Sequence, residues 1–306
     1  CAHDAPALIS APSIGCSLRE LIYAEPSRGV GACVSDGCYD PRPTVAGRFA
    51  EVRGAGRCAL VPFIVAGDPD LGTTARALEA LDAAGADVIE LGVPYSDPLA
   101  DGPTIQAAAA RALLKDTELA DVIAMVGETS PNVSAPIVMF TYFNPIMAMG
   151  LETFLARIKA AGASGLLVPD LPLEETGGIR AACDAAGIEL VLLATPTTPP
   201  DRMQEIAEAS SGFVYLVSVA GVTGARTEVA DRVEGLVSQL KGVTDKPVAV
   251  GFGVSEASQA ERLRNWGADG VIVGSALVKA LGEAESPEAG LAALTEKMQS
   301  LSGVLR

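Results

Sequence analysis

The chain has 306 residues, of which 49% are hydrophobic and 20% charged, a balance typical of a globular protein. Its net charge of −16 disfavours binding to nucleic-acid phosphates or anionic membranes, and aromatic residues at 4% are too few for base stacking. The single histidine is His3, so the body of the chain lacks the imidazole of a Ser-His-Asp triad or a histidine-rich metal site, and we expect no metal.

The chain divides into two parts of different pattern. Residues 1–43 mix Ser, Pro, Gly and Cys without a sustained period, and we expect an irregular leader or linker. Residues 44–306 alternate short apolar runs with Ala- and Glu-rich helical stretches, and we expect them to form one catalytic domain.

Eight apolar runs in this domain predict strands, and most are nearly continuous, as strands covered on both faces should be. The predicted strands are 58–66, 87–93, 136–142, 165–170, 189–195, 213–219, 247–253 and 270–276.

Helical patterns lie between these strands. The range 70–86, for example, has a threonine near its start as the expected N-cap and a glycine at its end. Eight strand–helix units predict a (β/α)₈ (TIM) barrel in a single domain, with a doubly wound open sheet as the alternative.

The second predicted strand carries an unusual acid. Glu90 lies between Ile89 and Leu91, and Asp97 and Asp101 follow in a loop rich in Pro and Gly. In a barrel the active site lies at the carboxyl ends of the strands, where a desolvated carboxyl group can exchange protons near neutral pH. The alternative is a buried acid that is paired with an arginine or capped by backbone groups.

The last two predicted strands end in glycines, within 251–255 and 273–279, where this fold commonly binds phosphate. The Ser275 hydroxyl can add a donor, and the Gly-rich range 220–228 suits a mobile lid. No lysine lies at the end of a strand and no dinucleotide-binding motif follows the first strand. These observations favour proton transfer by carboxyl groups on a phosphorylated substrate, without a cofactor. Aromatic and apolar side chains at strand ends suit a flat second half of that substrate: Phe63, Phe140, Tyr142, Leu167 and Tyr215.

Five motifs in order resemble the tryptophan synthase alpha subunit family over about residues 45–300. They are PFIVAGDPD (62–70), ELGVPYSDPLADGPTIQ (90–106), YLVSVAGVTGAR (215–226), VGFGVS (250–255) and GSALVK (274–279). The third motif looks more like the form found in plants and photosynthetic microbes.

This resemblance implies retro-aldol cleavage of indole-3-glycerol phosphate to indole and glyceraldehyde 3-phosphate. Glu90 matches the general acid/base of the family, Asp101 the carboxylate that binds the indole N–H, and Tyr215 a tyrosine near the reacting atoms. The other positions match an indole wall (Phe63, Phe140, Leu167), a phosphate site (Gly224, Gly253, Gly274, Ser275), a lid residue (Thr223) and an interface with the partner (Pro94, Asp97, Asn144).

The resemblance also implies a partner, the beta subunit, in an αββα complex. Pyridoxal phosphate (PLP) would belong to that partner, and this chain would hold no cofactor. One alternative is a stand-alone lyase that releases free indole, and others are a silent regulatory barrel or a different sugar-phosphate enzyme. The expected compartment is the plastid stroma in a photosynthetic eukaryote and the cytoplasm otherwise.

Overall fold

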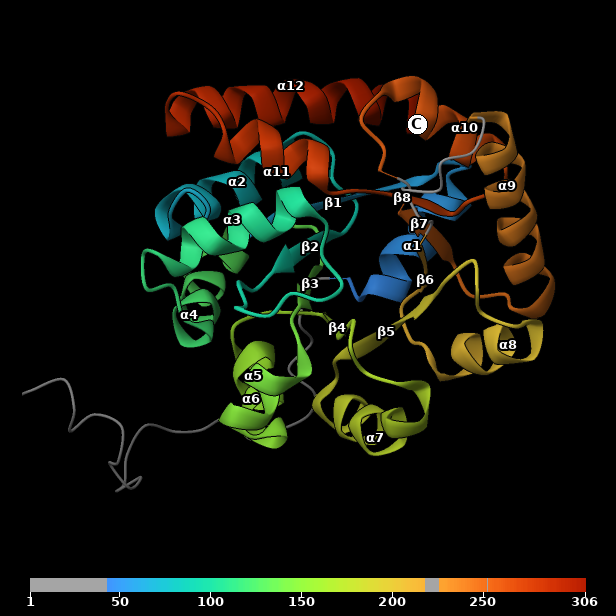
Figure 1. Cartoon of the computed structure of the whole chain (residues 1–306), viewed down its shortest axis with the longest axis horizontal. Helices are drawn as coiled ribbons and strands as arrows, with labels where there is room; N and C mark the ends of the chain where they lie inside the picture. The colour runs from blue at the N-terminus through green and yellow to red at the C-terminus, as the bar shows by residue number, and fades with distance from the viewer. Residues whose placement is uncertain (1–42, 218–225, 252) are drawn as a thin grey trace, which may run out of the picture. The chain divides into compact units, whose positions relative to one another are not determined.

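The structure is a computed structural model that describes residues 43–217, 226–251 and 253–306. Its strands are parallel and form one closed barrel in chain order (Figure 1). The strands are β1 (Ala59–Val65), β2 (Ile89–Gly92), β3 (Ile137–Phe140), β4 (Gly165–Leu167), β5 (Glu189–Ala194), β6 (Val214–Val217), β7 (Val248–Gly251) and β8 (Gly270–Val273). The last strand pairs with the first, Ala59 opposite Gly270, which confirms the barrel and excludes the open sheet.

Most of the helices lie around the barrel and connect successive strands, whereas α1 precedes the first strand and α11 and α12 follow the last (Figure 1). They are α1 (Val45–Gly54), α2 (Leu71–Ala83), α3 (Pro103–Leu113), α4 (Leu119–Thr129), α5 (Phe143–Met149), α6 (Leu151–Ala160), α7 (Thr176–Ala186), α8 (Pro200–Ala209), α9 (Arg226–Val243), α10 (Ala257–Asn265), α11 (Ser275–Gly282) and α12 (Pro287–Leu305), with 3₁₀ turns η2 (Ser130–Asn132) and η3 (Leu173–Glu175). Within the described ranges, no helix is both long and apolar enough to span a bilayer.

The prediction for α2 is confirmed at its carboxyl end and wrong at its N-cap. Its N-cap is Asp70, whose carboxylate accepts the Thr73 backbone N–H at 2.7 Å, so the expected threonine cap was wrong. Aspartate offers an acceptor directly before the helix, where the first N–H groups lack partners. The helix ends as predicted near Gly85, whose φ of 96° favours glycine.

Helix α1 closes the amino-terminal end of the barrel and was not identified from the sequence. Its Val45, Phe49 and Val52 are fully buried in the cluster of side chains inside the barrel. The Phe49 ring lies 5.2 Å from that of Phe213, centroid to centroid. The Glu189 carboxylate at the start of β5 accepts the backbone N–H groups of Val45 and Ala46, which the helix itself cannot satisfy. Because α1 closes this end, the barrel is open at the carboxyl ends of its strands.

Candidate active site

Strand alternation directs Glu90 into the barrel. Ile89 and Leu91 pack outward in the core between strands and helices, whereas Val88 belongs to the inner cluster. Glu90 has no exposed surface, and neither carboxyl oxygen has a hydrogen-bond partner among the described residues. Burial alone raises the pKa of Glu90 from 4.5 to about 8. The group is therefore mainly protonated at neutral pH, and no arginine of the described residues is paired with it.

Tyr215, on β6, lies near both candidate carboxyl groups. Burial raises the pKa of its hydroxyl, and the charges of Glu90 and then Asp101 raise it further. Its ring lies against Gly251 of β7, where an added Cβ would come within 2.7 Å of the Tyr215 hydroxyl oxygen. The fold thus brings Glu90 of β2, Asp101 of the loop that follows it and Tyr215 of β6 close together.

Asp101 is partly exposed in the loop before α3. Burial raises its pKa to about 6, and a hydrogen bond with the Tyr142 side chain counteracts part of that rise. The Tyr142 hydroxyl also accepts the Ala100 backbone N–H at 3.0 Å. Tyr142, predicted from the sequence as part of an apolar lining, is buried and places its hydroxyl directly at the acidic loop.

The predicted aromatic wall is assembled around Phe63 of β1. Its ring meets that of Phe140 edge to face, with centroids 5.3 Å apart and an interplanar angle of 75°. Leu167 pairs with Phe140 in register and is fully buried in the inner cluster. A Cβ at Gly92 would come within 2.6 Å of the Phe63 ring, so this position needs glycine.

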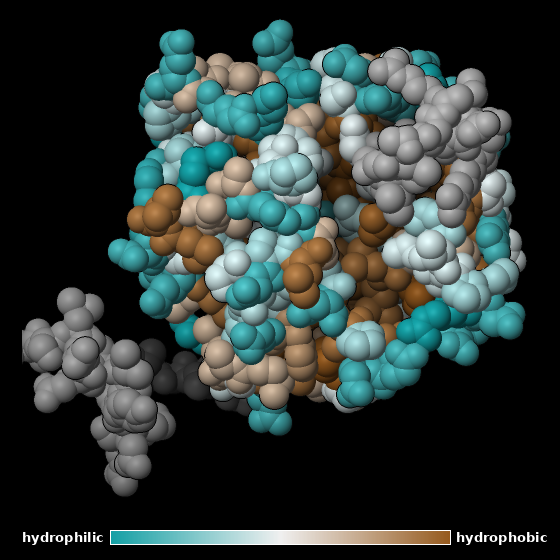
Figure 2. Space-filling view, in the orientation of Figure 1, coloured by the Kyte–Doolittle hydropathy of each residue, from teal (hydrophilic) through white to brown (hydrophobic). Residues whose placement is uncertain are grey.

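A cavity of about 350 Å³ lies above strands β4 to β6, with a lining that also comes from α8 and from Ala100. Leu193 lines it and also packs in the inner cluster with Tyr215 and Phe140, and Ala100, which directly precedes Asp101, lines it as well; Glu90 and Asp101 are not part of its lining. Figure 2 shows a hollow with a hydrophobic floor in the region where Figure 1 places β4 and β5. None of the residues that line it was predicted from the sequence as a site residue; they include Ala100, Pro169, Leu193 and Val217. Leu193 could have been found, because it is an inward-facing residue near the end of β5 that pairs with Tyr215.

The predicted phosphate site is described only in part. Gly274 is the N-cap of α11, and exposed Ser275 is the first residue of that helix. Gly253, exposed in the loop after β7, has a φ of 60° that favours glycine. A Cβ at Gly274 would lie 3.5 Å from the Phe63 ring, so this end adjoins the aromatic wall. Thr223 and Gly224 lie outside the described residues.

The residues predicted at a partner interface lie in the loop after β2 and at the start of α5. Asp97 is exposed and accepts a 2.6 Å hydrogen bond from Ser96. Asn144 is exposed and donates to the Tyr95 hydroxyl at 3.2 Å. Pro94 is buried, so within this chain it supports the loop rather than presenting a surface.

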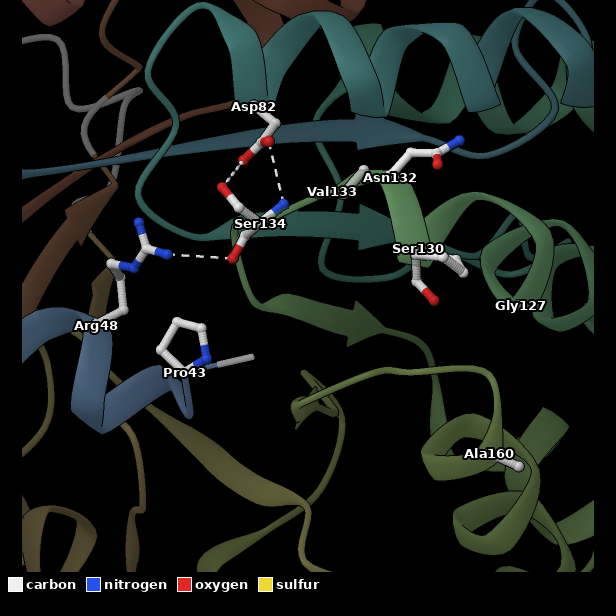
Figure 3. Close-up of a pocket in the computed structure, with 10 residues that line it drawn as sticks. Pro43, Arg48, Asp82, Gly127, Ser130, Asn132, Val133, Ser134 and Ala160 are labelled. Carbon is white, nitrogen blue, oxygen red and sulfur yellow. Dashed lines mark hydrogen bonds between the residues drawn. The ribbon is translucent and has the colours of Figure 1, made fainter. Parts of the chain in front are cut away.

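A larger cavity, of about 730 Å³, has neither Glu90 nor Asp101 in its lining. Figure 3 shows the residues that line it. Its lining comes from α1 and from segments that precede strands, at the closed end of the barrel. Arg48 donates to the Ser134 carbonyl at 3.1 Å, and Asp82 accepts from the Ser134 hydroxyl at 2.8 Å, so these polar groups bind each other (Figure 3). Barrel enzymes work at the opposite end, and cavity size does not identify the site here.

Comparison with known proteins agrees with the geometry. The family model described as tryptophan synthase alpha chain matches residues 49–305. Tryptophan synthase alpha chains from Synechocystis and Arabidopsis thaliana are 60% and 57% identical, over 82% and 84% of this chain and 94% of each relative.

Solved structures give the same result. A structure of Mycobacterium tuberculosis tryptophan synthase has a TM-score of 0.78 at 39% identity, and the match covers 87% of this chain and 99% of the other. The tryptophan synthase A-subunit from Pyrococcus furiosus has a TM-score of 0.75 at 42% identity, covering 81% and 98%.

The closed barrel, with carboxyl groups of raised pKa at the open end, is typical of (β/α)₈-barrel enzymes that transfer protons. The chain belongs to the tryptophan synthase alpha chain family. It is a lyase of tryptophan biosynthesis.

Proposed function

We propose that this chain cleaves indole-3-glycerol phosphate to indole and glyceraldehyde 3-phosphate by a retro-aldol reaction. The observation that carries the proposal is Glu90, an acid fully buried inside the barrel without a hydrogen-bond partner among the described residues. An unpaired buried carboxyl group destabilises a fold, and such groups concentrate at catalytic sites.

Glu90 has the protonation state that the first step needs. Because its pKa is about 8, the carboxyl group holds a proton at pH 7 and can donate it to C3 of the indole ring. The resulting carboxylate then takes the proton of the glycerol hydroxyl next to the bond that breaks. That bond's electron pair returns to the ring as the hydroxyl carbon becomes the aldehyde, so both protons and the electron pair are accounted for.

Asp101 would stabilise the ring while it carries positive charge. Its carboxylate accepts the indole N–H, and an ionised acceptor at this position favours the charged intermediate over neutral substrate. With a pKa of about 6, Asp101 is mainly ionised at pH 7, whereas Glu90 is mainly protonated. Two carboxyl groups in different environments thus take different roles.

Binding would use the two sides of the open end. Phe63, Phe140, Leu167 and the cavity residue Leu193 would contact the indole ring, and Tyr215 would lie near the reacting atoms. Gly253, Gly274 and Ser275 would bind the phosphate, helped by the N–H groups and dipole at the start of α11. We also assign Thr223 to the lid and Gly224 to the phosphate site, on the family resemblance.

We propose the tryptophan synthase beta subunit as the partner, in an αββα complex. The names of the relatives, alpha chain and A-subunit, support this assignment. On this chain, exposed Asp97, Asn144 and Leu99, the last with 90% of its surface accessible, offer a mixed polar and apolar surface beside the site. PLP would be bound by the partner and not by this chain. For a chain from a photosynthetic eukaryote, the similarity to the Arabidopsis relative supports a location in the plastid stroma.

A lyase assay with indole-3-glycerol phosphate tests the proposal, run with and without added beta subunit. We expect indole formation by the chain alone that increases when the beta subunit is added. Failure to form indole in both conditions would reject the reaction. A high kcat that the beta subunit leaves unchanged would reject the partnership and favour a stand-alone lyase.

A further inference from the structure

The Tyr142 hydroxyl lies between two groups of the loop that follows β2. Its oxygen accepts the Ala100 backbone N–H at 3.0 Å, and Ala100 directly precedes Asp101, so the hydroxyl lies close enough to the Asp101 carboxyl group for each to affect the pKa of the other. A phenol has one proton and can also accept. Because the Ala100 N–H occupies an acceptor position, the hydroxyl proton is available for Asp101.

We propose that Tyr142 is a positioning residue: its hydroxyl donates to the Asp101 carboxylate while accepting the Ala100 N–H, and these two bonds fix the carboxylate that holds the substrate ring. The inference rests on the proposed function, because it deepens the role of Asp101 in that reaction. In this role Tyr142 supports Asp101, a polar contact of the substrate, and is not part of the apolar wall of the substrate site.

The Tyr142 ring is itself held in place. It stacks on the Tyr95 ring, with centroids 5.0 Å apart and an interplanar angle of 29°. Tyr95 is fixed in turn by the 3.2 Å hydrogen bond from Asn144, at the start of α5. A loop carboxylate is positioned poorly by its own backbone, whereas a buried, stacked tyrosine at the N-cap of α5 supplies a rigid donor.

Charged neighbours keep the hydroxyl a donor. Burial, the Asp101 charge and the more distant charge of Asp170 all raise the pKa of Tyr142, so the hydroxyl stays protonated across the working range. The groups that act on Asp101 and its surroundings are Tyr142, Tyr215 and Glu90. Among the described residues, Tyr142 alone lowers the pKa of Asp101, and loss of its hydroxyl should raise that pKa.

The test is the pH profile of indole formation by a Tyr142→Phe variant, which keeps the stacked ring and loses the hydroxyl. A hydrogen bond to a charged group predicts a fall in kcat/KM of about 10-fold to 100-fold at pH 7.5. The loss should be greater at pH 6 than at pH 8, because more Asp101 is protonated in the variant. Tyr95→Phe is the comparison variant: it keeps the stacked ring and removes the hydroxyl that accepts from Asn144, which does not face Asp101, so we expect a smaller loss than in Tyr142→Phe and no change in the shape of the pH profile.

Combination with Asp101→Asn separates positioning from general damage to the loop. If Tyr142 acts through the Asp101 carboxylate, adding Tyr142→Phe to the Asp101→Asn variant costs less than about twofold further. An undiminished loss in that background, or a Tyr142→Phe enzyme with wild-type rate and pH profile, would overturn the inference. Wild-type protein without lyase activity would instead refute the proposed function, so the two failures are distinguishable.

Discussion

Replacement of Glu90 by glutamine should make the protein more stable at alkaline pH while removing its activity. Glutamine has nearly the same shape as glutamate but does not ionise. In the wild type, a carboxyl group with a pKa of 4.5 when unfolded has a pKa of about 8 when folded. The folded state therefore holds a proton that the unfolded state releases, and the stability of the wild type falls as pH rises from about 4.5 to 8.

The size of this effect follows from the two pKa values. Each unit of difference corresponds to about 1.4 kcal/mol. Because the unfolded state releases the Glu90 proton more readily, the wild type is less stable than at acid pH by roughly 1 kcal/mol at pH 5 and roughly 4 kcal/mol at pH 8. The stability of Glu90→Gln minus that of wild type should therefore increase by about 3 kcal/mol between these pH values. Any constant cost of the buried amide cancels from this difference.

Urea unfolding at several pH values measures this quantity directly. Glu261, exposed on α10, provides the matched control, because Glu261→Gln makes the same chemical change at the surface. We expect that control to follow the wild type within about 0.5 kcal/mol at every pH. A Glu90→Gln difference that changes by less than about 1 kcal/mol from pH 5 to pH 8 would refute the account of Glu90 as an unpaired, desolvated acid.

Three further substitutions test other parts of the site. Asp101→Asn should reduce kcat less than Glu90→Gln does, because an amide still accepts the indole N–H but supplies no charge; steady-state assays giving the reverse order would contradict the assigned roles. Gly251→Ala places a methyl group 2.7 Å from the Tyr215 hydroxyl oxygen and should lower kcat/KM about tenfold, so an unchanged value would argue against a fixed Tyr215. Asp68→Asn disrupts a bidentate pair with Arg111, whose two bonds are 2.8 and 2.7 Å long, and should cost about 2 kcal/mol in urea unfolding, since Asp68 is buried but Arg111 is partly exposed. A cost below about 0.5 kcal/mol would show that this link between the β1–α2 loop and α3 contributes little.

The barrel could be predicted from the sequence because its eight strands are short apolar runs separated by helices. The pairing of β1 with β8 follows from the number of strands, since eight strand–helix units are typical of a closed barrel, and no sequence pattern in either strand indicates it. Helix α1 was missed although Val45, Phe49 and Val52 have helical spacing, because it directly follows an irregular segment and belongs to no strand–helix unit.

The acids of the site could also be predicted, since Glu90 interrupts an apolar strand and any polar residue there needs an explanation. The lack of a hydrogen-bond partner for Glu90 among the described residues could not be predicted, because pairing depends on side chains from distant segments. The same limit applies to Tyr142: its sequence position indicates an aromatic strand end, whereas its hydrogen bond to Ala100 depends on how the β2 and β3 loops pack. The walls contributed by Pro169 and Val217 likewise depend on the shape of the loops above the strands.

The most direct test of the central claim is the kcat for cleavage of indole-3-glycerol phosphate by wild-type protein and by Glu90→Gln, measured at pH 7.5. If Glu90 transfers the protons, its loss should reduce kcat by more than about 10³-fold while the protein remains folded. A folded Glu90→Gln variant that retains more than a tenth of the wild-type kcat would contradict the account.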